Sequence, residues 1–365
     1  MRTGPFFPPK TISWYMARLF IARSAGVLAG LIIVLMALDL LGESGNILAY
    51  PGNGDAALWH YVSLRVPQLV QRFLPFAILL GTLITLVAMN QNSEIISMKA
   101  AGISAHQILA PLFLASLAVA ALSFWFNDHV VARATAALSA WQDVDYGKVP
   151  DHRGIVSNVW VRAGEDLIHA DTVTGRGART VLHRVSLYDR AGDRLMAITT
   201  ADTAAQGHGG WVLRNVREFN VGQGTVTPRP TLVIGRGVTA DRFTLSSVDP
   251  DGLSFRALNR AIGDLRAAGR PTASLQTVLW HKLSGPLSAF LMPLLASVAG
   301  FGLARSGKMF IRAVIGMALG FAYFVADNFA LAMGNIGAYP PLLAAWAPFL
   351  LFLLIGEAVL IRTEE

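Results

Sequence analysis

The sequence predicts an integral membrane protein of six transmembrane helices, with an external β domain inserted between the third and fourth. Three observations predict this class. Hydrophobic residues make up 53% of the 365 residues and charged residues only 15%, whereas a soluble domain carries about 25% charge. Apolar runs toward both ends of the chain reach the roughly 20 residues that cross a bilayer. Between them, residues 150–250 alternate with the period of two that is typical of β-strands.

Composition also excludes several classes of function. The chain has no cysteine, which excludes disulfides, thiolate zinc sites and cysteine nucleophiles. The net charge is +7, but the basic residues form no single run, and Lys and Arg gather at cytoplasmic membrane flanks for topological reasons. We therefore expect no nucleic-acid partner.

Each predicted transmembrane helix is an apolar run with few charges. The first run is too long for the apolar region of a signal peptide, and no small-x-small cleavage site follows it, so we expect it to be retained. The six predicted spans are residues 19–41, 66–89, 107–127, 283–304, 311–333 and 341–361.

Orientation follows from the Lys and Arg residues near the ends of the spans. Four basic and no acidic residues lie before the first span or at its very start (Arg2, Lys10, Arg18 and Arg23), whereas the loop 42–64 has no basic residue. Because basic residues mark the cytoplasmic side, both termini and the loops 90–106 and 304–312 are predicted to be cytoplasmic. The long segment 128–282 is then external.

The external segment divides into a β domain and a helix. We predict a β-sandwich or jelly-roll over 128–253, with a hairpin around Ala191-Gly192-Asp193, and a connecting helix and linker over 254–282. In that helix Leu258, Ile262 and Leu265 share one face. The two membrane parts are then 1–127, which includes a short cytoplasmic helix over 92–105, and 283–365.

Two features of the sequence resemble functional motifs but lack residues or spacing that the motifs require. Residues 302–309, GLARSGKM, nearly match a phosphate-binding loop, but Met309 replaces its hydroxyl residue and the stretch joins two membrane spans. Any ATP that drives this protein must therefore be bound by another chain. His152, His169 and His183, with Asp171 nearby, lack metal-ligand spacing. We expect no metal site, no cofactor bound by this chain and no catalytic centre.

Two spans carry pairs of glycines that allow helix backbones to approach closely. The pairs are Gly26 with Gly30 and Gly316 with Gly320. Packing within the chain is one explanation. The sharper one is that both helices face a partner subunit.

Ionisable and aromatic residues gather near the external ends of the spans. Such residues are costly in a bilayer and usually face protein or a water-filled cavity. One interpretation is the rim of a cavity for an amphiphile, and the other is pairing within the bundle, for example of Arg72 with Asp39 or Asp327. The residues assigned to this cavity or gate, besides the glycine pairs, are Asp39, Glu43, Arg72, Phe73, Phe76, Asp327 and Asn328.

The stretch NSEIISMKAAGIS, residues 92–104, predicts a short helix between two spans. Ser93 is the expected cap, Glu94 suits the first turn, and Gly102 allows the helix to end. A helix this short needs a surface to dock on, either lipid headgroups or a cytoplasmic partner that Glu94 and an Ile/Met face would contact. The residues assigned to the partner contact are Ser93, Glu94, Ile95, Ile96, Met98, Lys99 and Gly102.

This stretch resembles the signature of the LptF/LptG permease family, which belongs to the ABC exporter of bacterial lipopolysaccharide. The resemblance covers essentially the whole chain, and residues 65–81, 279–296 and 321–329 also resemble the family, most of all its LptG branch. It implies a Gram-negative inner membrane location, with the β domain in the periplasm. It also implies an LptF-like permease partner, an LptB-like ATPase dimer that uses ATP and Mg²⁺, an LptC-like periplasmic protein and lipopolysaccharide as substrate.

The resemblance implies roles for the residues above. Glu94 matches the coupling-helix glutamate that meets the ATPase, and the spans with the glycine pairs match lateral gates. One departure concerns the first span, where some relatives carry a basic residue suited to lipid A phosphates, because residues 24–64 contain no Lys or Arg. Phosphate contacts would then come from Arg72, Arg133 or bridging divalent ions. The alternative function is an anchor that transmits force from an ATPase and moves no lipid.

Overall fold

The computed structural model describes most of the chain and divides it into two compact units. The described residues are 8–149, 156–175, 180–191, 194–207, 210–235, 238, 240, 243, 249–267, 270–300 and 309–364. The first unit comprises residues 1–149, 250–259 and 273–365 and is helical, and the second comprises 150–249 and 260–272 and holds the sheet.

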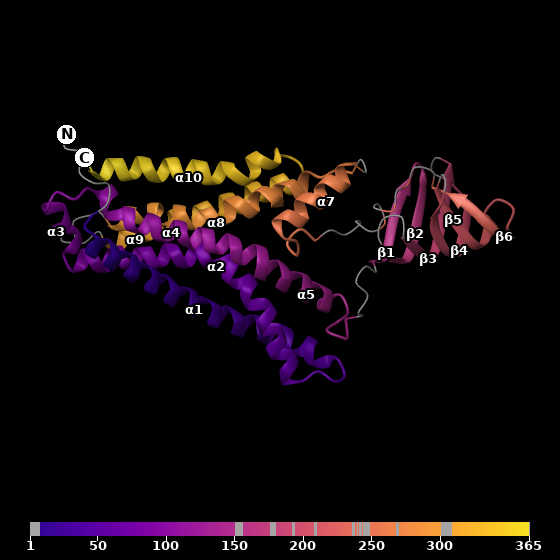
Figure 1. Ribbon diagram of the computed structural model, residues 1–365, viewed down its shortest axis with the longest axis horizontal. Helices are drawn as coiled ribbons and strands as arrows, with labels where there is room; N and C mark the ends of the chain where they lie inside the picture. The colour runs from indigo at the N-terminus through magenta and orange to yellow at the C-terminus, as the bar shows by residue number, and fades with distance from the viewer. Residues whose placement is uncertain are drawn as a thin grey trace. The chain divides into compact units, whose positions relative to one another are not determined.

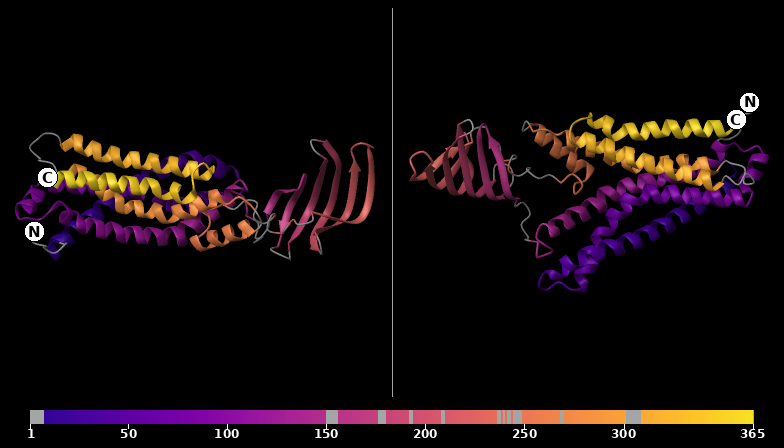
Figure 2. Two further views of the ribbon diagram at one scale, coloured as in Figure 1. Left: turned by 90° about the horizontal axis from the view of Figure 1, so that it is seen from above. Right: turned by 180° about the vertical axis from the view of Figure 1, so that it is seen from behind.

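Long helices build the first unit, and they run side by side in Figures 1 and 2. Their bounds are α1 Lys10–Ala49, α2 Asp55–Gln91, α3 Glu94–Ala100, α4 Ala105–Phe126, the π-helical turn η1 Asn127–Val131, α5 Ala132–Gln142, α8 Ala273–Gly300, α9 Met309–Asn335 and α10 Pro341–Glu364. Among the described residues, five segments are long and apolar enough to cross a membrane. These five are Lys10–Ala49, Asp55–Gln91, Ala105–Gln142, Ala313–Asn335 and Pro341–Ile361.

The first three helices are longer than the spans predicted on them. The 40 residues of α1 extend about 60 Å at 1.5 Å per residue, twice the thickness of a bilayer core. The helix that carries the third predicted span does not end at 127, because η1 and α5 continue the helix of α4 to Gln142. Residues 128–149 therefore belong to the helical unit and not to the β domain, whose predicted start at 128 is wrong.

The predicted span at 283–304 lies on α8, which is not among the five candidates and has described residues only to 300. Its middle is a packing centre: Leu291, Leu295 and Ala296 are fully buried. It packs against α2, α4, α9 and α10. A helix covered on so many sides needs apolar residues for protein contacts as much as for lipid.

Close backbone approach fixes the contact between α1 and α2. A Cβ atom on Gly81 of α2 would lie 2.6 Å from Cα and 2.7 Å from the backbone nitrogen of Ser24 in α1. Elsewhere on the same two helices, Met16 and Phe20 of α1 and Leu86 of α2 are fully buried in the core of the unit. Glycine at 81 is therefore required by the space between the two helices.

The second unit is a six-stranded antiparallel sheet in the sequential order β1-β2-β3-β4-β5-β6, with no strand crossing over (Figure 1). The strands are β1 Val156–Ala163, β2 Asp166–Thr174, β3 Val181–Ala191, β4 Arg194–Gly207, β5 Gly210–Asn220 and β6 Thr225–Ile234. The alternating runs are thus confirmed as strands. The hairpin is confirmed by the pairing of Ala191 with Arg194, while Gly192 and Asp193 lie outside the described residues.

The described strands do not form the predicted jelly-roll, which needs two Greek keys and eight strands. On one face of the single sheet, the buried side chains pack instead with Val238, Ala240 and Phe243, which follow β6. Trp211 on that face stacks edge-on with Phe243, and its indole nitrogen donates a hydrogen bond of 2.9 Å to the Val238 carbonyl. The predicted connecting helix is confirmed as α7, Phe255–Ala267, with Leu258, Ile262 and Leu265 buried.

The close contact at Gly81 predicts that alanine substitution will change stability differently at Gly81 and at Gly45. Gly81→Ala should destabilise the chain by about 1–3 kcal/mol, because the Ser24 backbone cannot yield to the added methyl group. Gly45→Ala, in open space on α1, should be neutral or stabilising by up to about 1 kcal/mol, because alanine favours helices. Thermal unfolding of both variants in detergent measures the difference. Equal midpoints would contradict the packing described here.

Candidate functional site

The predicted short helix exists as α3, but Ser93 does not cap it through its side chain. Ser93 has a left-handed backbone with φ of 61°, and its hydroxyl makes no capping bond. Its carbonyl oxygen instead accepts hydrogen bonds from the Ser97 amide at 3.0 Å and the Ser97 hydroxyl at 2.9 Å. The cap prediction is therefore wrong, because this tight turn sets the serine backbone in a conformation that leaves the hydroxyl outside the helix.

The other end of α3 follows the prediction. Gly102 has φ of +83°, a region that side chains other than glycine rarely adopt. The Gly102 amide donates to the Lys99 carbonyl at 2.9 Å and the Ile103 amide to the Met98 carbonyl at 3.1 Å. This glycine-terminated ending turns the chain directly into α4, whose first turn Ser104 and Gln107 close with a reciprocal capping box.

The α3 residues that we predicted to contact a partner differ in their burial. Ile95 and Met98 are buried in the chain's own core, so they cannot fill a partner's pocket as we predicted. Ile96 remains 43% exposed. The Glu94 carboxylate is partly exposed and accepts a hydrogen bond of 3.3 Å from the Tyr15 hydroxyl of α1. The helix therefore docks on its own bundle through one face and presents Glu94 and Ile96 on another.

A cavity of about 430 Å³ opens among the helices of the first unit. Its volume lies in the range of small-molecule pockets, about 300–1,000 Å³. It is lined by residues from α2, α4, η1, α5, α8 and α9, together with Asp251. Five of the predicted cavity residues line it: Arg72, Phe76, Gly320, Asp327 and Asn328.

The lining changes character along the helices. The early α2 residues Gln68, Gln71 and Arg72 are polar, and Leu74 and Phe76 follow them deeper along the helix. The same order holds on α8, where polar residues near its start give way to apolar ones. The α8 lining residues are Val278, His281, Lys282, Gly285, Pro286, Ser288, Ala289 and Met292. One end of the cavity is therefore polar and the other mostly apolar.

Two contacts cross the cavity wall between helices. His281 of α8 lies 3.1 Å from a carboxylate oxygen of Asp327 on α9, which joins these two helices. Phe76 of α2 and Phe324 of α9 pack edge to face, with ring centroids 5.0 Å apart. Among the described residues Arg72 has no hydrogen bond or ion pair, and its side chain is exposed. The predicted pairing of Arg72 with Asp39 or Asp327 is therefore wrong.

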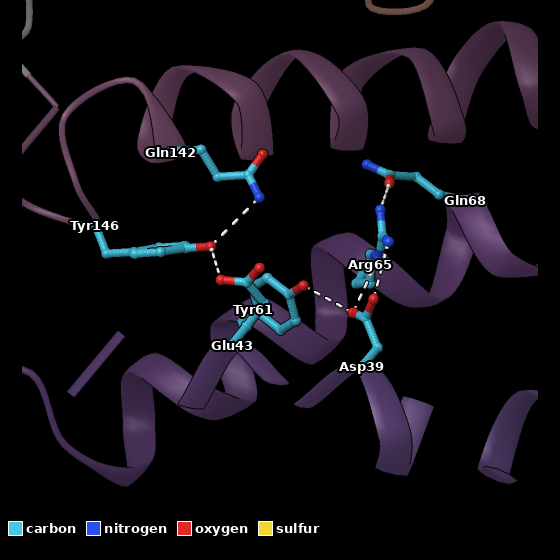
Figure 3. Close-up of polar contacts among 7 residues, drawn as sticks. All are labelled: Asp39, Glu43, Tyr61, Arg65, Gln68, Gln142 and Tyr146. Carbon is cyan, nitrogen blue, oxygen red and sulfur yellow. Dashed lines mark hydrogen bonds and ion pairs between the residues drawn. The ribbon is translucent and has the colours of Figure 1, made fainter. Parts of the chain in front are cut away.

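Asp39 and Glu43 belong to two neighbouring hydrogen-bonded groups between α1, α2 and the end of α5 (Figure 3). Arg65 binds Asp39 through two nitrogens, at 2.9 and 3.1 Å, and the Tyr61 hydroxyl donates to the same carboxylate at 2.7 Å. Arg65 also donates to the Gln68 side-chain oxygen at 2.8 Å. Asp39 therefore pairs within the bundle, one of the two interpretations of the sequence, and does not line this cavity.

Glu43 is held in the second of these groups. The Tyr146 hydroxyl donates to its carboxylate at 2.9 Å and accepts from the Gln142 amide at 3.3 Å. Burial raises the pKa of Tyr146; the Gln142 hydrogen bond lowers it in part, and the bond to the Glu43 carboxylate raises it further. Tyr146 therefore stays protonated at neutral pH and remains the donor to Glu43, which also does not line the cavity.

The two glycine pairs have different environments. Gly316 and Gly320 are buried on α9, where added Cβ atoms would meet Leu83 and Leu79 of α2, so this pair packs within the chain. Gly26 and Gly30 lie on an exposed face of α1 with no atom near enough to contact an added Cβ. Phe73 packs beside the Asp39 network in the α1–α2–α5 cluster and does not line the cavity.

Comparison with known proteins is decisive for the family. The sequence model of a protein family, the lipopolysaccharide export system permease LptF/LptG, matches residues 14–362. The chain belongs to the LptF/LptG family. It is 27% identical over 311 residues to the lipopolysaccharide export system permease protein LptG of Escherichia coli strain K12, covering 83% of this chain and 84% of that protein. It is 25% identical over 329 residues to LptG of Haemophilus influenzae strain Rd, covering 86% and 89%.

Several residues that shape the site in this LptF/LptG chain escaped the sequence reasoning. Arg65 lies one residue before the predicted second span, so it was not weighed as a partner for Asp39. His281 precedes Lys282 in the first half of α8, and two such polar residues next to each other before a predicted span were the signal in the sequence for a polar cavity wall. Asn127 and Asp128 line the cavity because α4 continues past the predicted end of the third span.

The β domain has its own cavity. A hollow of about 620 Å³ on the sheet includes Asp166, Asp189, Glu218 and Arg229. Partial burial and the neighbouring Asp166 raise the pKa of Asp189, and Arg229 lies 3.1 Å from Glu218. In the described part of the chain, no group of three His, Asp or Glu residues could hold a metal ion.

The remaining predicted positions are accounted for as follows. His183 bonds to the Thr174 hydroxyl at 3.1 Å, and His169 stacks near Trp160. His152 and residues 302–308 of the phosphate-loop-like stretch lie outside the described residues. Arg133 is exposed on α5 and does not line the cavity.

The Asp39–Arg65 pair can be tested by a double-mutant cycle. Asp39→Asn and Arg65→Gln should each destabilise the chain, and the cycle should show a coupling energy of about 1–3 kcal/mol, because each single change leaves a half-buried charge unpaired. Unfolding of the purified variants measures this energy. Arg72→Gln is the matched control on α2 and should change stability by less than about 0.5 kcal/mol. Additive effects of the two changes would show that the pair is not coupled.

Proposed function

We propose that this chain is the LptG-like permease subunit of an ABC transporter that extracts lipopolysaccharide from the outer leaflet of the inner membrane. The observation that carries the proposal is the cavity of α2, α8 and α9, polar at one end and apolar at the other, in a chain of this family. An amphiphile would place its headgroup at the polar end and its acyl chains against Phe76, Phe324 and Met292.

The proposed topology has six spans, with α8 as the fourth, both termini in the cytoplasm and the β domain in the periplasm. The distribution of Lys and Arg along the sequence supports it. It places the polar end of the cavity, near Arg72 and His281, toward the periplasm. Lipopolysaccharide would then enter from the outer leaflet and leave toward the β domain, which would pass it to an LptC-like periplasmic protein.

Energy would come from a separate ATPase. We expect this chain to bind no nucleotide and an LptB-like dimer to use ATP and Mg²⁺. Glu94 and Ile96 on the exposed side of α3 would contact that dimer, with Ser93, Lys99 and Gly102 forming the rest of the contact region. Ile95 and Met98 are held in the bundle, so a push on α3 would pass directly into the core that packs α1, α2 and α4.

An LptF-like permease would complete the cavity. The exposed Gly26 and Gly30 of α1 support a close helix contact there, because a glycine face that meets nothing in its own chain can accept a partner backbone. Gly316 and Gly320, which are covered by α2, would position α9 at the other side of the cavity.

The first test is recovery of the complex. The chain is co-expressed with its LptF-like and LptB-like partners, purified by a tag on this chain, and assayed for both subunits and for lipopolysaccharide. The proposal predicts all three in near-stoichiometric amounts. A Gly26→Val, Gly30→Val double variant should lose the permease while keeping its own fold. Recovery of the ATPase without lipid would favour the force-transmitting anchor, and recovery of neither subunit would contradict the proposal.

The second test concerns Glu94. Glu94→Ala should lower lipopolysaccharide transport and lipid-stimulated ATPase activity by about tenfold, the effect of losing one charge-assisted hydrogen bond to a partner. Stability should change little, because the side chain is at the surface. Tyr15→Phe is the control, since it removes only the internal partner of Glu94. If Tyr15→Phe reproduces the defect, or Glu94→Ala transports normally, the assigned role is wrong.

A further inference from the structure

One polar atom on the wall of the cavity is left without a partner. The amide oxygen of Asn127 is buried, and no donor among the described residues reaches it. Asn127 is also one of the residues that line the cavity. A buried acceptor without a hydrogen bond costs about 1–3 kcal/mol, so such groups are rare unless a ligand uses them.

The backbone at this position is unusual as well. Asn127 begins η1, a π-helical turn that interrupts one continuous helix from Ala105 to Gln142. Isolated π-helical turns are rare and are frequent at functional sites, because the extra residue changes the direction of the side chains that follow. The turn coincides with the cavity: Asn127, Asp128 and Val131 of η1 all line it.

The neighbouring acceptor is already satisfied. The Asp128 carboxylate accepts a hydrogen bond from the backbone amide of Phe255, at the start of α7. That bond, with the edge-to-face contact between Phe124 and Phe255, fixes the position of η1 against α7. Asn127 is thereby held at the wall with its acceptor unused.

We infer that Asn127 contacts the cargo: its side chain turns so that the amide oxygen, buried behind the cavity wall in this structure, accepts a hydrogen bond from an N–H or O–H group of the headgroup. This inference rests on the proposed function and adds a specificity-determining residue to it. Arg72, a cation without a partner among the described residues, lines the same cavity. The two residues together fit an anionic amphiphile whose headgroup also carries hydrogen-bond donors, such as a phosphorylated amino sugar, better than one that carries an anion alone.

The test compares two lipids on the purified complex of this chain with its permease and ATPase partners. One is monophosphoryl lipid A, which has hydroxyl and amide donors, and the other is dihexadecyl phosphate, which is anionic without donors. Asn127→Leu should weaken binding of the first by about threefold to tenfold, the loss of one hydrogen bond of about 0.5–1.5 kcal/mol, and leave the second unchanged. The unfolding midpoint should not fall, since no internal hydrogen bond of that oxygen is lost.

Ser284→Ala is the matched control. Its hydroxyl oxygen on α8 is also buried without a partner among the described residues, but it does not line the cavity, so binding of both lipids should stay unchanged. Asn127→Ala removes the same amide without added bulk and replaces the leucine variant if that one fails to fold. An equal effect on both lipids, no effect on either, or a lower midpoint with unchanged binding would overturn the inference. A wild-type complex that binds neither lipid would overturn the proposed function itself.

Discussion

Pairing of polar and ionisable side chains within an apolar bundle is the constraint on which the arrangement of these helices depends. A charged side chain in a membrane needs a partner or water, and the pairs in this chain each join two different helices. Asp39 ties α1 to Arg65 of α2, Asp327 ties α9 to His281 of α8, and His106 of α4 lies 2.9 Å from Glu357 of α10. These pairs hold the helices at the heights at which their small residues meet, as at Gly81 and Ser24.

The same constraint separates structural from functional polar groups. Asp39 and Glu43 are fully used by Arg65, Tyr61 and Tyr146, which explains why neither reaches the cavity (Figure 3). Arg72 and the Asn127 oxygen remain on the cavity wall with no partner in the described chain. In an amphiphile carrier these are the groups expected to be left for the cargo, whereas an anchor that only transmits force has no use for them.

The sequence predicted the helices and strands of the fold, but not where the helices end or which side chains pair between them. Alternation identified the strands, and apolar runs identified the helices, because both patterns are local. It missed Arg65 as the partner of Asp39, since Arg65 and Arg72 lie seven residues apart, on nearly the same helix face and about 10 Å apart in height. Choosing between them required the true start of α2 at Asp55. The predicted jelly-roll is not confirmed, because alternation along the sequence predicts strands and not their order in a sheet. The Ser93 side chain does not cap α3, because the backbone of Ser93 is left-handed.

We propose that lipopolysaccharide passes through the cavity between α2, α8 and α9. Photo-crosslinking tests it most directly, with a photoreactive phenylalanine at Phe324 in the cavity and, as control, at Phe329, which is 57% exposed on α9 and does not line it. In cells, the account predicts lipopolysaccharide adducts at 324 that change when the ATPase is inactivated, and few at 329. Equal adducts at both positions, or none at 324, would contradict it.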